Sequence, residues 1–77
     1  MSLKDARWNL IDARYDFCLQ KDIIAECNAW IAVHGRGSLA AENWELMRKK
    51  AFGEMNKARG RLIRAIKDVR GLLYAGN

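Results

Sequence analysis

Three side chains in this 77-residue sequence could bind a metal ion or act as nucleophiles: Cys18, Cys27 and His34. Cys27 and His34 are one heptad apart and face the same way on a helix, but two ligands do not make a zinc site, and Cys18 lies off their line. On a continuous helix the two cysteines are about 13 Å apart, too far for a disulfide. No Ser-His-Asp grouping or glycine-rich phosphate loop accompanies them. These residues therefore predict a protein that is not an enzyme and needs no metal or cofactor.

The distribution of charge points to phosphate or to an acidic protein. Residues 1–37 carry five bases and five acids, whereas residues 38–77 carry nine bases and four acids, so the net charge of +5 belongs to the second half. A basic strip follows one side of a helix there: Lys50, Lys57, Arg61 and Arg64. It predicts contact with nucleic acid or an acidic protein, or else a solvated face. The strip holds no aromatic residue, and the sequence has no helix-turn-helix, RNP or zinc-finger pattern, which weighs against nucleic acid.

Three further arginines recur every eleven residues in the same half of the chain, at the edge of its apolar residues: Arg48, Arg59 and Arg70. Their aliphatic stems could cover the edge of the core while the guanidinium groups stay in water. They could instead pair with aspartates near the N-terminus. Arginine beside exposed aromatic residues is also typical of an interaction hot spot. The sequence leaves these three roles open.

Two long helices joined by a short turn must position these residues. The chain has no proline and its first glycine is Gly35, so residues 3–33 can form one helix of roughly 45 Å. In the turn, 34–38, Gly35 suits the position after a helix and Ser38 suits an N-cap. A second helix is expected over 39–74. Its glycines fall on the outer side, where they do not break it: Gly53, Gly60 and Gly71.

The apolar residues predict how the two helices pack. The second helix has one apolar face: Trp44, Met47, Ala51, Met55, Ala58, Leu62, Ala65, Ile66, Val69 and Leu73. The first helix has a stripe that repeats every seven residues: Leu3, Leu10, Phe17, Ile24 and Ile31. The recurring alanines of the second helix allow close approach. The facing stripes predict an all-α fold, an antiparallel two-helix hairpin with a coiled-coil-like seam.

A second apolar stripe on the first helix has no counterpart within a hairpin: Trp8, Ile11, Tyr15, Leu19, Trp30 and Val33. A single 77-residue domain made of two helices buries too little apolar surface to offset the conformational entropy of folding. Something else is expected to cover the second stripe. It predicts a homodimer with a four-helix arrangement, or a surface for a different protein.

The sequence also gives an expectation of cellular location. It has no secretory h-region and no run of about 18 uncharged apolar residues. We therefore expect a cytoplasmic protein that has reduced thiols and does not enter a membrane.

In length, basicity and single-hairpin architecture the chain resembles small proteins that phages make early in infection to disable host factors. Among them are the helical-hairpin anti-activators of quorum-sensing regulators. It resembles more distantly the plasmid hairpins of the Rop type, which dimerise and bind RNA. The resemblance concerns the shape of the whole chain and transfers no functional residue. It implies a protein-binding modulator that inhibits a host regulatory protein or enzyme stoichiometrically, with a basic hairpin that binds DNA or RNA as the alternative.

Overall fold

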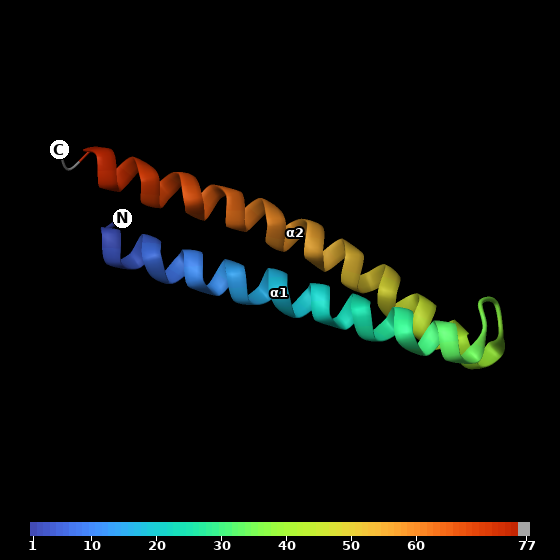
Figure 1. The fold of residues 1–77 in the computed structure, drawn as a ribbon. Coiled ribbons are helices and arrows are strands. Elements are labelled where there is room, and N and C mark those ends of the chain that lie inside the picture. The colour runs from blue at the N-terminus through green and yellow to red at the C-terminus, as the bar shows by residue number, and fades with distance from the viewer. Residues whose placement is uncertain (76–77) are drawn as a thin grey trace.

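Two long helices make up nearly all of residues 1–75, the part of the chain that the structure, a computed structural model, describes. Helix α1 spans Leu3–His34 and helix α2 spans Leu39–Ala75. They run antiparallel, so the start of α1 and the end of α2 lie together, and the turn lies at the far end (Figure 1). The rod measures 58 × 14 × 14 Å. The described residues contain no strand, which confirms the all-α helical hairpin, and both helices end one residue after the predicted position.

Short-range hydrogen bonds fix the ends of the helices. Ser2 Oγ accepts a hydrogen bond from the Asp5 N–H at 3.1 Å and caps the start of α1. At the end of α1, the Gly35 N–H donates to the carbonyl four residues earlier at 2.9 Å, and its φ of 86° suits glycine. Ser38 Oγ accepts from the Ala41 N–H at 3.1 Å, which is the predicted cap of α2. The reversal of the chain is therefore encoded locally.

Replacing Gly35 with alanine is expected to destabilise the hairpin by about 1 kcal/mol, because a side chain is strained at positive φ. Gly60→Ala is the matched control, since Gly60 lies within α2 and an added Cβ would meet no atom within 4 Å. This control should be neutral or stabilising, because alanine is the better helix former. Urea unfolding measures both variants. Equal effects would show that the conformation of Gly35 does not limit stability.

Small side chains line the contact between the helices. All four buried residues of α2 are alanines: Ala41, Ala51, Ala58 and Ala65. The buried residues of α1 are Ala6, Ala13, Ile24, Cys27 and Ile31. Half-buried larger residues fill the spaces between them, among them Leu10, Phe17, Met55, Leu62 and Val69. We call this contact the seam. It repeats every seven residues in both helices, as in an antiparallel coiled coil, and its alanines permit the predicted close approach.

Three residues that the sequence assigned to the apolar face of the second helix lie outside the seam. Met47, Ile66 and Leu73 are 47%, 39% and 44% exposed. Leu72, next to Leu73, is half-buried instead. The cause is geometric, because a seven-residue repeat drifts by about 20° per heptad on a straight helix wheel. Over the 37 residues of α2 this drift moves the edge of the wheel's apolar face out of contact.

Helix α2 continues through its three glycines, and a Cβ added at Gly53, Gly60 or Gly71 would meet no atom within 4 Å. The glycines therefore lie on the outer side, as predicted, and they do not break the helix. Over the described residues, neither helix combines the length and the apolarity that crossing a bilayer requires.

Candidate interaction surfaces

The side of α1 opposite the seam carries four large apolar side chains, which we call the outer face: Trp8, Ile11, Tyr15 and Leu19. They are 58%, 53%, 71% and 41% exposed. Their spacing of three and four residues makes them neighbours on one helix surface. Trp8 and Ile11 line a shallow hollow whose other walls, Leu3, Lys4 and Arg7, also belong to α1. Helix α2 therefore leaves this face open.

Trp30 and Val33, which the sequence grouped with these four residues, are placed differently. Trp30 stacks on Trp44 of α2 with ring centroids 5.4 Å apart, and on His34 at 5.8 Å. Val33 is 73% exposed near the turn. The drift of the seam along α1 brings Trp30 beside α2, although a straight wheel puts it opposite. The structure therefore brings four of the six predicted residues together.

The basic strip predicted on the second helix lies near acids. Arg61 forms an ion pair with Asp16 of α1, and Lys57 forms one with Glu54 at 3.7 Å. These are the two ion pairs found within residues 1–75. Lys50 is exposed one heptad before Lys57. Exposed pairs of this kind stabilise a fold little, but they reduce the charge that the strip offers to a ligand.

A hollow beside the Arg61–Asp16 pair shows the same mixture of charges. Its charged walls are Asp12 of α1 and Arg61, Arg64 and Asp68 of α2. We call this side of the hairpin the mixed flank: Asp12, Asp16, Glu54, Lys57, Arg61, Arg64 and Asp68. Because its charges largely cancel, the predicted basic strip does not form a strongly positive surface.

The opposite side of the hairpin carries cations without acids. Five exposed bases lie there, three on α1 and two on α2: Arg7, Arg14, Lys21, Arg59 and Arg70. Three apolar side chains of α2 lie among them, and they are 44%, 45% and 39% exposed: Phe52, Ile63 and Ile66. We call these eight residues the basic flank. The acids within residues 7–21 and 52–73 all belong to the mixed flank.

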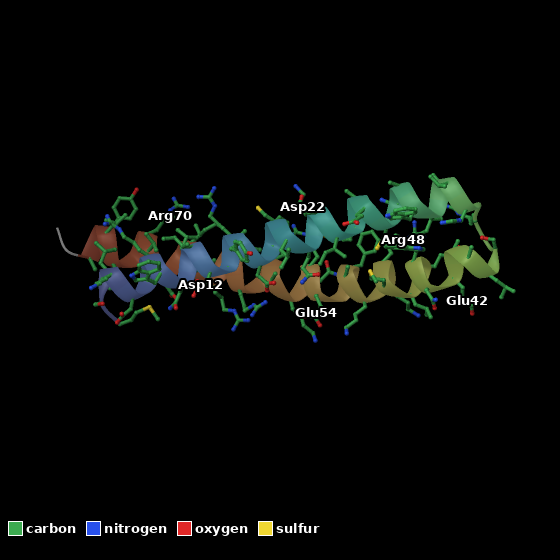
Figure 2. All side chains as sticks on the ribbon, turned by 90° about the horizontal axis from the view of Figure 1, so that it is seen from below. Asp12, Asp22, Glu42, Arg48, Glu54 and Arg70 are labelled. Atoms are coloured by element: carbon green, nitrogen blue, oxygen red, sulfur yellow. The ribbon has the colours of Figure 1, made fainter. Side chains whose placement is uncertain are left out.

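The positions of these residues follow from the seam. On α2, Arg61 lies on one side of half-buried Leu62 and meets Asp16, so Arg59 and Ile66 lie on the other side. On α1, the series that begins at Arg7 recurs every seven residues and continues to Asn28. Asn28 Oδ1 accepts a hydrogen bond from Arg48 Nη1 of α2 at 2.8 Å, on the same side of the seam. Figure 2 shows Arg70 along one edge of the hairpin and Asp12 and Glu54 along the other.

Helix wheels drawn for each helix alone do not show the basic flank, because it forms only when the two helices are placed side by side. The available signal is the recurrence of Arg7, Arg14 and Lys21 at the seven-residue period of the seam. Of the three arginines spaced by eleven, Arg48 bonds to Asn28. The other two, Arg59 and Arg70, are exposed on the basic flank, and within residues 1–75 neither forms an ion pair with an aspartate.

The candidate ligands and nucleophiles are dispersed. Cys27 is fully buried in the seam and Cys18 is exposed. His34 stacks on Trp30 near the turn. Within residues 1–75 no three side chains of His, Cys, Asp or Glu gather as a metal site would require. Cys27 therefore serves as a small apolar side chain of the core.

Comparison with known proteins gives no match: no family model, no curated protein and no solved structure is similar to this chain. The surfaces of the hairpin are therefore the basis on which its function is argued. They are the outer face of α1, the mixed flank and the basic flank.

Proposed function

We propose that this chain is a small protein-binding modulator, which inhibits a regulatory protein or an enzyme by occupying one of its surfaces stoichiometrically. The supporting observation is the composition of the basic flank, where Phe52, Ile63 and Ile66 lie among the cations. A phosphate backbone calls for cations alone. A protein interface instead buries apolar side chains at its centre and is enriched in arginine. The target surface that fits this flank is acidic around an apolar centre.

The architecture suits inhibition by occupation. Both helices are continuous and the turn is only residues 35–38, so the basic flank is formed before binding. A preformed surface loses little conformational entropy when it binds, which favours affinity. This mechanism requires no catalytic group and no cofactor.

Charge reversal tests this proposal. The basic flank variant combines Arg7→Glu, Arg14→Glu and Arg59→Glu, and the control combines Lys50→Glu, Lys57→Glu and Arg64→Glu. Both change the net charge equally and leave the seam intact. In nuclease-treated lysate of the source cells, the tagged wild type and the control are expected to retain a stoichiometric protein partner, and the basic flank variant to lose it.

Equal loss of the partner in both variants would assign the binding to overall charge and contradict the proposal. Loss of the partner on nuclease treatment would also contradict it. Circular dichroism verifies that each variant keeps its helices.

We further infer that two copies associate through the outer face of α1, giving a four-helix arrangement. Six of the nine buried residues are alanines, so the hairpin alone buries little apolar surface. The outer face adds four large apolar side chains once a second copy covers it. Light scattering at micromolar concentration is expected to report a dimer.

Nucleic-acid binding is the second candidate function, favoured by the five cations of the basic flank. Under the proposed function, filter binding at about 0.15 M salt should retain neither random DNA nor RNA at sub-micromolar protein. Sub-micromolar retention would support the alternative. If the predicted strip is its site, combining Lys57→Gln, Arg61→Gln and Arg64→Gln should then flatten the salt dependence by close to one unit of slope per lost contact.

A further inference from the structure

The outer face of α1 belongs to a longer strip with symmetric spacing. Charged residues extend it at both ends, and the whole strip reads Lys4, Trp8, Ile11, Tyr15, Leu19, Asp22 and Glu26. Counted from Tyr15, the other members stand 4, 7 and 11 residues away in both directions. Such a strip coincides with itself after a rotation of 180° about an axis beside residue 15. This is the geometry of two antiparallel α1 helices related by a two-fold axis.

The middle of the strip is matched in chemistry under this rotation. Ile11 of one copy meets Leu19 of the other, and this contact occurs twice. Tyr15 meets its own equivalent at the axis. These side chains are 53%, 41% and 71% exposed in the hairpin, so a second copy would remove much apolar surface from water.

The ends of the strip are matched in charge. Lys4 of one copy meets Glu26 of the other, and the Trp8 indole N–H faces the Asp22 carboxylate. All four residues are exposed, and neither ion pair of residues 1–75 involves Lys4, Asp22 or Glu26. These groups are therefore available for pairing between copies.

We infer that a second copy of this chain packs antiparallel against the outer face of α1, with the two-fold axis beside Tyr15. The inference rests on the self-association proposed above and adds its register. The contact runs from Lys4 to Glu26, about 33 Å along the helix. A parallel pair would place Lys4 against Lys4 and Asp22 against Asp22, which repel. Isologous pairing of basic flanks would bring ten cations together and is likewise disfavoured.

Disulfide trapping tests the register in a Cys18→Ser background. Tyr15→Cys is expected to form a covalent dimer on mild oxidation, because the axis brings residue 15 of the two copies together. Ile11→Cys alone should react at least about tenfold more slowly, since its two copies are offset by about 12 Å along the helix. Mixing Ile11→Cys with Leu19→Cys should trap a heterodimer efficiently and leaves Tyr15 in place.

Charge exchange gives a second test that does not depend on cysteine. Lys4→Glu should weaken dimerisation on the order of tenfold, because it puts like charges at both ends of the contact. Adding Glu26→Lys to Lys4→Glu should restore the affinity. Analytical ultracentrifugation measures both variants.

The outcomes separate the register from the proposal on which it rests. A wild-type monomer at micromolar concentration would overturn both the self-association and the register. A dimer in which Ile11→Cys cross-links to itself as fast as Tyr15→Cys would overturn only the register. Partner capture by the basic flank is measured separately and is decided by neither result.

Discussion

Replacing Ala58 with leucine is expected to destabilise the hairpin by about 1–3 kcal/mol, the usual cost of overpacking a close contact. Ala58 is fully buried in the seam, and the residues one heptad away, Ala51 and Ala65, are 4% exposed. A leucine there would push the helices apart along several turns, so the loss extends beyond the substituted layer. Urea unfolding, followed by circular dichroism, measures the free energy of unfolding.

The control for this variant adds the same side chain outside the seam. Ala25 is an exposed position of α1, so Ala25→Leu should change the free energy of unfolding by less than about 0.5 kcal/mol. If Ala25→Leu proved the more damaging of the two, the seam would have been assigned to the wrong side of the helices.

Combining Trp8→Ala with Tyr15→Ala is expected to abolish self-association at micromolar concentration. The two side chains are the most exposed aromatic residues of the outer face, and central aromatic anchors commonly contribute about 2 kcal/mol or more to an interface. A loss of this size for each residue corresponds to roughly a 30-fold weakening of binding. Light scattering measures the oligomeric state across a dilution series.

Val33→Ala is the matched control for the aromatic variant. Val33 is as exposed as Tyr15 and lies on the same helix, but it stands outside the strip from Lys4 to Glu26. It should leave self-association unchanged. A weakening by Val33→Ala equal to that of the double variant would move the interface toward the turn.

Local features predicted the fold well. The absence of proline, the first glycine at position 35 and a capping serine at 38 mark where the chain reverses, and the structure places the turn there. The alanines at 51, 58 and 65 were predicted as the close contact, and all three are buried. Each of these signals acts within one helix or one turn, so neighbouring residues were enough to detect it.

Features that depend on both helices together were harder to predict. Trp30 and Leu73 were misplaced because a straight wheel does not follow a seven-residue seam over a long helix. The partner of Arg61 was missed because Asp16 is 45 residues away in sequence. The basic flank was missed for the same reason, since its cations come from two helices that meet only in the folded hairpin.

The basic flank takes on a new meaning in the dimer that we propose. A two-fold axis between antiparallel α1 helices turns neither side of the four-helix layer over, so the flanks of both copies face the same direction. Two identical acid-binding sites then stand side by side on one rigid plate. A target that is itself a two-fold dimer could engage both at once, and its second contact would form at the high effective concentration set by the first. Such a dimer would be held far more tightly than either of its subunits alone, so the inhibitor would select its target by symmetry as well as by charge.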